Sequence, residues 1–281
     1  MSFRSIRGPL RGVFITGLLA CVGLVSAVSA QASTLPTLSL TLTKSSITVG
    51  GSTQSGAVNV VSTATGVKEA SVILVLLKPG ATFEEAEAAI QKAHGETNVV
   101  DKYGSIVFDA EVSSGQTSEA QTYLQPGQYV ALIPGGEGKG SKAHALFTVT
   151  AAASPVALPA PEATIRSIEF GFKGPSTLHD GELVRFENEG FLIHMDVAAP
   201  VKNMKAAKQV VKDLLTGKEK AIEKLIVGPP AGFAGPLSHE AFQQETITAK
   251  PGIYIEVCFM DTQDGRSHSQ LGMERIIRIT K

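Results

Sequence analysis

A short segment near the middle of the chain separates two parts that resemble each other. Residues 151–163 read AAASPVALPAPEA, and this Ala- and Pro-rich composition favours an extended, semi-rigid connector. On each side of it, a Pro-Gly turn leads into a strand-forming run that contains a tyrosine, at residues 124–130 and again at 249–255. The sequence therefore predicts two related domains, residues 31–150 and 164–281, joined by a linker at 151–163.

Each part contains short strand-forming runs bounded by turn residues. In the first part these runs are 38–42, 58–61, 72–77, 105–112, 128–133 and 145–149, and in the second they are 165–172, 182–187, 192–197, 245–249, 253–259 and 275–280. Each part also has one helical pattern, the first behind a capping box of Thr82 and Glu85 and the second at about 203–215. We therefore expect an all-β fold, with two tandem antiparallel Greek-key sandwiches that each carry one inserted helix.

The N-terminus has the pattern of a secretory signal peptide. Arg4, Arg7 and Arg11 precede an apolar stretch at 12–28, and small residues end it at 27–30. This predicts an exported protein that is cleaved after Ala30. Two alternatives stay open: Cys21 follows a Leu-Leu-Ala sequence that faintly resembles a lipoprotein box, and an uncleaved segment would be a short membrane anchor.

The charge balance limits the partners. The chain has 25 Lys and Arg against 26 Asp and Glu, a net charge of -1. Removing residues 1–30 deletes three arginines and no acid, which leaves 22 basic and 26 acidic residues and a net charge of -4. We expect no nucleic-acid partner, and contact with a membrane only through the signal or anchor segment. Cleavage would also remove Cys21, so that Cys258 would be the single cysteine and no internal disulfide could form.

Four residues of the second part are candidate ligands for a metal ion: His194, Cys258, His268 and Met273. A thiolate, two imidazoles and a weak axial thioether are the donors of copper electron-transfer centres. Each residue also has an ordinary explanation. A lone cysteine in a strand is commonly a small buried apolar residue, Met273 is suited to fill core, and the histidines can be strand or loop residues.

The second part, from Ile165 onward, resembles the cupredoxin family. Phe-Glu-Asn-Glu-Gly at 186–190 leads to His194 as in the cupredoxin approach to its first histidine. Cys258, His268, Gly272 and Met273 resemble the Cys, His and Gly-Met of the family's last loop. The resemblance implies one type 1-like copper ion held by His194, Cys258, His268 and Met273. It also implies a possible redox protein partner that docks near Leu271 and Met260.

Two features depart from the small members of this family. Nine residues, 259–267, separate Cys258 from His268, so His268 reaches the site only if Asp264 and Gly265 turn the loop back. Cys258 also shares a strand face with Glu256, so that burying both requires a bulge or a strand end there.

The first part lacks the ligand set. Aligned through the repeated segments, Ile73 takes the place of His194 and Ile133 that of Cys258. We expect the first domain to be a structural or partner-binding copy without copper ligands.

The leading hypothesis is an exported copper-binding protein that carries electrons or handles copper through one mononuclear site. The alternative is a metal-free cupredoxin-like module for structure or protein interaction at the cell surface. A multicopper oxidase or nitrite reductase fits poorly, because the six histidines include no His-x-His pair. We therefore expect a carrier or binding protein and no enzyme.

Overall fold

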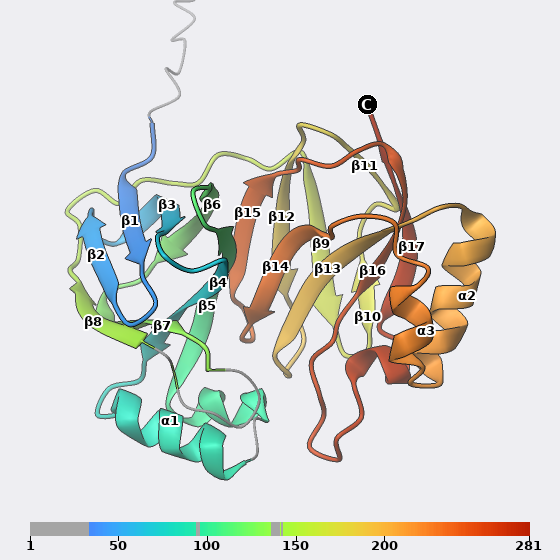
Figure 1. The fold of residues 1–281 in the computed structure, drawn as a ribbon. Helices are drawn as coiled ribbons and strands as arrows, with labels where there is room; N and C mark the ends of the chain where they lie inside the picture. The colour runs from blue at the N-terminus through green and yellow to red at the C-terminus, as the bar shows by residue number, and fades with distance from the viewer. Residues whose placement is uncertain (1–33, 94–95, 136–140, 142) are drawn as a thin grey trace, which may run out of the picture. The chain divides into compact units, whose positions relative to one another are not determined.

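The computed structural model describes residues 34–93, 96–135, 141 and 143–281 (Figure 1). Residues Leu35–Lys281 form one compact unit. The predicted signal peptide, its cleavage after Ala30 and the alternative role of Cys21 lie outside the described residues. Within the described part of the chain, no helix has the length and apolar character to cross a membrane.

The first half is a sandwich of two sheets. One layer holds β1 (Thr37–Leu42), β2 (Ile47–Gly51), β3 (Gly56–Ala64) and β6 (Thr117–Leu124); the other holds β4 (Glu69–Leu77), β5 (Gly104–Ser113), β7 (Gly127–Ile133) and β8 (Ala143–Val149). Alternating residues of the two layers meet in one apolar core, which includes Leu38, Leu40, Leu74 and Phe108. The strand-forming alternation of the sequence therefore corresponds to real strands with one face in this core.

The second half repeats the plan. One layer holds β9 (Ala163–Ile168), β10 (Gly171–Lys173), β12 (Leu183–Asn188) and β15 (Phe242–Thr246); the other holds β11 (Thr177–His179), β13 (His194–Val201), β14 (Ala231–Leu237), β16 (Gly252–Val257) and β17 (Glu274–Thr280). Its own core includes Ile165, Phe186, Tyr254 and Ile277. The all-β prediction is confirmed.

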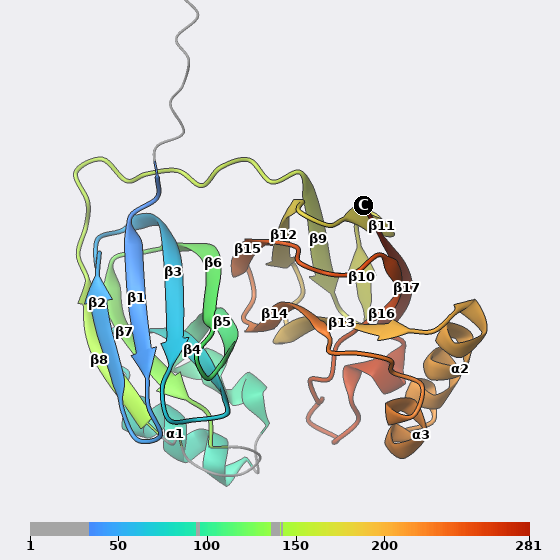
Figure 2. The same ribbon diagram turned by 45° about the horizontal axis from the view of Figure 1, so that its top comes forward.

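The two halves share one continuous sheet. Strand β15 pairs with β6, with Gln244 opposite Gln121, and the Gln244 side chain donates to the Gln121 side-chain oxygen at 2.9 Å. The result is an eight-stranded sheet in the order β10-β9-β12-β15-β6-β3-β1-β2, which runs through both halves (Figure 2). Ser238 makes a second contact between the halves. Its N–H donates to the Ile106 carbonyl at 2.9 Å, and its hydroxyl oxygen accepts from the Ile106 N–H at 2.9 Å.

Three details of the structure differ from the predicted architecture. Strands β2, β6, β11 and β14 lie where the sequence predicts no strand. Strand pairing is not wholly antiparallel, because β1 and β3, β9 and β12, and β11 and β17 pair in parallel. The halves also carry more than one helix each. The first has α1 (Phe83–Lys92) and the 3₁₀ helix η1 (Thr97–Lys102), and the second has α2 (Met204–Leu215), α3 (Glu219–Glu223) and η2 (His268–Leu271). Short helices bury few apolar residues, so the helical period that reveals longer ones is missing.

The starts of α1 and α2 are set by local capping hydrogen bonds. The capping box at Thr82 and Glu85 is present, and Asn203 caps α2 by accepting from the Ala206 N–H at 3.0 Å. The run predicted at 165–172 is broken into β9 and β10 by a turn at Phe170, whose φ of +57° is unusual for an aromatic residue.

Residues 151–162 contain no helix or strand, and they are hydrogen-bonded to the sheet. Ala152 N–H donates to the Ser55 hydroxyl at 3.0 Å, Ala57 N–H donates to the Val156 carbonyl at 2.8 Å, and Gln244 donates to the Pro159 carbonyl at 3.1 Å. The connector therefore packs along both halves.

Strand register fixes how the two halves correspond. Tyr129 and Tyr254 occupy the same place, and each hydroxyl donates to a carbonyl four residues upstream, at 3.0 Å and 2.8 Å. Three residues after each tyrosine, Leu132 pairs with Ile73 and Val257 pairs with Val197. Ile73 is thus the counterpart of Val197, which corrects its predicted equivalence to His194. By the same register, His194 corresponds to Ala70.

Candidate metal centre

The first ligand segment is held by a turn before β13. The Asn188 side chain donates to the carbonyls of Leu192 and Leu237 at 2.7 and 2.8 Å, and its oxygen accepts from the Gly190 N–H at 2.8 Å. His194 is the first residue of β13 and is buried. The Phe-Glu-Asn-Glu-Gly sequence thus forms the turn before β13, and His194 is the first residue of that strand.

The second segment is the loop between Cys258 and His268. Strand β16 ends at Val257, so Cys258 lies just beyond the end of the strand. A strand end at this point is one of the two ways in which both Cys258 and Glu256 can be buried. The loop then folds back as a hairpin, in which Thr262 N–H donates to the Arg266 carbonyl at 2.9 Å. Gly265 has φ +78°, a left-handed conformation that suits glycine. The predicted reversal at Asp264 and Gly265 is therefore present.

Backbone hydrogen bonds close this loop onto the cysteine. His268 N–H donates to the Met260 carbonyl at 2.7 Å, and Ser269 N–H donates to the Cys258 carbonyl at 3.1 Å. The short helix η2, capped by Ser267, carries the His268 ring inward. Residues ten positions apart are thereby brought into contact.

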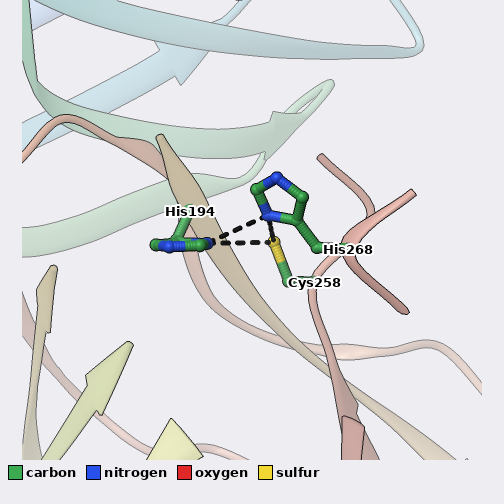
Figure 3. Close-up of side chains that lie close together, drawn as sticks. All are labelled: His194, Cys258 and His268. Carbon is green, nitrogen blue, oxygen red and sulfur yellow. Dashed lines mark hydrogen bonds between the residues drawn. The ribbon is translucent and has the colours of Figure 1, made fainter. Parts of the chain in front are cut away.

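Three donor atoms converge in the buried interior (Figure 3). The Nδ1 atoms of His194 and His268 are 3.0 Å apart, and the Cys258 Sγ lies 3.9 Å from the first and 3.4 Å from the second. All three side chains are at most 1% exposed. Met195 N–H donates to the same sulfur at 3.4 Å. Three of the four candidate ligands, His194, Cys258 and His268, therefore lie together.

The three donor atoms are close enough to share one metal ion, but the two ring nitrogens, 3.0 Å apart, would have to move apart by about half an ångström to do so. Two nitrogen or sulfur ligands about 2.0–2.3 Å from one ion, in a trigonal arrangement, lie about 3.5–4 Å from each other. Both histidines present the same ring nitrogen to the same point, and a thiolate with two imidazoles is the donor set of trigonal blue-copper centres. The cluster fits one type 1-like copper ion.

Met273 lies beside the cluster and is fully buried. Its carbonyl accepts from the Cys258 N–H at 3.2 Å, and its N–H donates to the His268 carbonyl at 3.0 Å. The backbone of Met273 thus ties the two ligand residues to β17. The role of its thioether as a weak axial ligand stays a prediction from the resemblance.

The protonation of the cluster suits a metal ion. Burial lowers the pKa of His194 to about 4, assisted by the neighbouring His268, and burial likewise lowers the pKa of His268 to about 4. Both imidazoles are therefore neutral near pH 7 and can offer a lone pair. Burial raises the pKa of the Cys258 thiol to about 12. A bound cation would have to displace that proton, as metal ions do at thiol ligands.

The far side of the histidines faces Glu169 and Phe170. The His194 Nε2 lies 4.0 Å from a Glu169 oxygen, which accepts from the Phe191 and Leu192 N–H groups. A side chain at Gly190 would collide with both groups, at 2.6 and 2.7 Å, so glycine permits this approach. The Phe170 ring meets the His268 ring edge to face at 5.3 Å. At 4.0 Å, the Glu169 carboxylate is too far from Nε2 for the hydrogen bond by which carboxylates commonly orient metal-binding histidines.

Sequence reasoning missed a contribution from the first half. Asn98, on η1, accepts from the Ile193 N–H at 2.8 Å and donates to the Asp261 carbonyl at 3.3 Å. One side chain therefore holds the residue before His194 and the loop between Cys258 and His268. The sequence has no local signal for this contact, because Asn98 lies 95 positions from Ile193.

Sequence reasoning also missed the polar interior beneath the cluster. Asp196, Glu256 and Arg275 lie inside the second sandwich, where both carboxylates are at most 2% exposed and Arg275 donates to Glu256. Burial raises the pKa of both carboxyl groups, and the charge of Glu256 raises that of Asp196 further. Because Arg275 pairs with Glu256, we assign the negative charge to Glu256 and the proton to Asp196.

No known family model matches the chain, and no curated protein matches it either. Solved structures do align with it. Auracyanin from Roseiflexus castenholzii is 17% identical over 42% of this chain and 95% of its own, with a TM-score of 0.26. Azurin from Methylomonas sp. strain J is 10% identical over 41% and 97%, with a TM-score of 0.26. Copper-containing nitrite reductase from Thermus scotoductus is 13% identical over 87% and 68%, with a TM-score of 0.25.

These aligned proteins are cupredoxins and a two-domain enzyme of the same fold, the family that the sequence resembles. The set includes both electron carriers and enzymes. At such low identities and TM-scores, the likeness carries no argument about what this chain does. The chemistry of the site rests on the residues described above.

Proposed function

We propose that this protein is an exported, cupredoxin-like electron carrier with one copper ion bound by His194, Cys258 and His268. The convergence of three buried donor atoms within 4.8 Å of one another carries this proposal. The export signal predicted at residues 1–30 supplies the location.

The residues around the ligands favour a preorganised site. The His194 turn is fixed by Asn188, the loop is fixed by backbone bonds from His268 and Ser269, and Met195 N–H donates to the sulfur. A copper ion bound there supplies one-electron chemistry. A buried, rigid donor set supports rapid electron transfer, because little protein or solvent rearranges when the charge changes.

A carrier also needs a surface on which a redox partner can dock. The resemblance points to Leu271 and Met260, but the Met260 side chain packs against the apolar cluster under α1. The Phe191 ring is 77% exposed and stacks on His239 at 5.2 Å, on the turn that leads to His194. We propose Phe191 and Leu271 as the apolar contacts for a redox protein.

The test is a Cu(II) titration of the purified protein and of Cys258→Ser, followed by visible absorption and a free-thiol assay. We expect an intense thiolate-to-copper band that saturates at one equivalent with loss of the free thiol, and no band in Cys258→Ser. A folded protein that shows no band and keeps its thiol would overturn the copper proposal. The metal-free interaction module would then become the working function.

A further inference from the structure

A pocket of about 340 Å³ lies in the first half, between α1 and the outer face of the sheet formed by β5, β4, β7 and β8. Its walls are mostly apolar. The sheet contributes Ile73, Val75 and Leu132, and the helix contributes Phe83 and Ile90. Its volume lies within the range of about 300–1,000 Å³ that is usual for small-molecule sites.

In the second half, the corresponding space between the helix and the sheet is filled with side chains. There, α2 buries Ala207, Val210 and Leu214 against Ile255 and Val257 of β16, and these residues form one packed cluster. Helix α1 also packs on an apolar cluster, through Phe83 and Ile90, but it fully buries only Phe83 and Ala86 and leaves a hollow beside them. The hollow under α1 is therefore a property of the first half and is not imposed by the architecture.

One wall of the pocket offers a hydrogen-bond acceptor. The Glu87 side chain lines it, and one Glu87 oxygen accepts from the Ser141 N–H at 2.5 Å. A carboxylate has about four acceptor positions, so further donors can be accommodated there. An apolar cavity with a carboxylate at its wall selects a molecule that is apolar over most of its surface and carries a hydroxyl or amino group.

We propose that this pocket binds a small, largely apolar molecule whose hydroxyl or amino group donates a hydrogen bond to Glu87. The apolar walls bury the body of the ligand, and Glu87 fixes its orientation.

The pocket also touches the metal-binding loop. Phe259, Met260 and Asp261 line it, and they follow Cys258 directly. The Met260 carbonyl accepts the His268 N–H, so the loop that touches a ligand in the pocket also positions a copper ligand. None of the candidate copper ligands is among the residues that line the pocket.

The experiment measures fluorescence of N-phenyl-1-naphthylamine, an apolar amine, added to the purified metal-free protein. We expect saturable enhancement at one site. Ile90→Trp fills the pocket and should weaken binding at least tenfold. Ile222→Trp is the matched control, since this partly buried helical residue packs against the α2 cluster and should leave binding unchanged. Glu87→Leu should weaken binding of the amine severalfold and leave binding of naphthalene, which has no donor, unaffected.

Circular dichroism and thermal unfolding establish that each variant is folded. A folded wild-type protein without enhancement, or enhancement that Ile90→Trp leaves intact, would overturn the proposal. Equal loss of amine and naphthalene binding in Glu87→Leu would overturn the role of Glu87. Copper plays no part in this measurement, so a failure here is separate from a failure of the copper titration.

Discussion

The two halves of this protein use one sandwich plan for different interiors. In the first half, the positions that correspond to His194, Cys258 and Met273 are Ala70, Ile133 and Ala143, and all three belong to its apolar core. The pair Glu256 and Arg275 likewise corresponds to Ala131 and Ala145. At these five positions, the first half thus has apolar side chains, whereas the second half has ionisable and potential metal-binding ones.

This comparison separates the requirements of the fold from those of the site. The tyrosine hydrogen bond, the parallel first pairing and the central strands occur in both halves, so they belong to the fold. The ligand set and the pair of Glu256 and Arg275 have no counterpart among the described residues of the first half, although that half also buries Asp109. Buried polar and charged groups of this kind must be offset by partners.

The difference between the two halves is tested most directly at Cys258 and its counterpart Ile133. Cys258→Ala should abolish the copper absorption band, whereas Ile133→Ala should keep the band in the folded protein. Ile133→Ala removes buried core and should lower the free energy of unfolding by about 2–5 kcal/mol. Copper titration and urea unfolding measure the two effects. A band that survives in Cys258→Ala would show that the ion, if bound, does not use the thiol.

The buried ion pair offers a sharper test. Glu256→Ala leaves Arg275 with its charge largely buried and should cost about 3–5 kcal/mol in unfolding free energy. The double variant Glu256→Ala/Arg275→Ala reproduces the Ala131 and Ala145 pair of the first half, and it should lose less than the single variant. Urea unfolding of the two variants and of Arg275→Ala completes the cycle. Additive losses would mean that the two side chains do not interact.

The buried histidines make the metal-free protein sensitive to acid. Because the folded pKa of His194 and His268 is about 4 and the unfolded value is near 6.5, the unfolded chain binds more protons between these pH values. Stability should therefore fall as the pH drops from about 6.5 to 4, on the order of 3 kcal/mol for each histidine. Urea unfolding at several pH values measures this loss, and the double variant His194→Gln/His268→Gln should lack that part of it.

The smallest expected effect concerns the contact between the halves. Asn98→Ala removes two hydrogen bonds to the ligand segments and should lower the unfolding free energy by about 1–2 kcal/mol. It should also speed copper loss to a chelator about tenfold, as changes next to metal ligands do. Asn59→Ala is the control, because the Asn59 side chain donates to Glu119 at 3.2 Å within the first half. Equal copper loss in both variants would remove Asn98 from the site.

Much of this arrangement follows from local sequence signals. Alternating apolar residues predict the central strands, the Thr82 and Glu85 pair predicts the start of α1, and Asp264 with Gly265 predicts the reversal that returns His268 to Cys258. The order of His, Cys, His and Met predicts the donor set. These features act over a few residues, so steric and hydrogen-bonding rules suffice to find them.

Other features depend on contacts between distant parts of the chain. The shared eight-stranded sheet, the Asn98 bridge, the pairing of Glu256 with Arg275 and the correspondence of Ile73 with Val197 have no local signal. The pocket under α1 depends on how far the helix side chains reach toward the sheet, which packing alone decides. Short-range preferences in the sequence specify most of the strands, the main turns and the identity of the donor atoms, although they do not reveal β2, β6, β11 or β14. Which donors meet, which charges pair and where a cavity remains depend on the tertiary structure, because burial and distance arise when separate strands pack together.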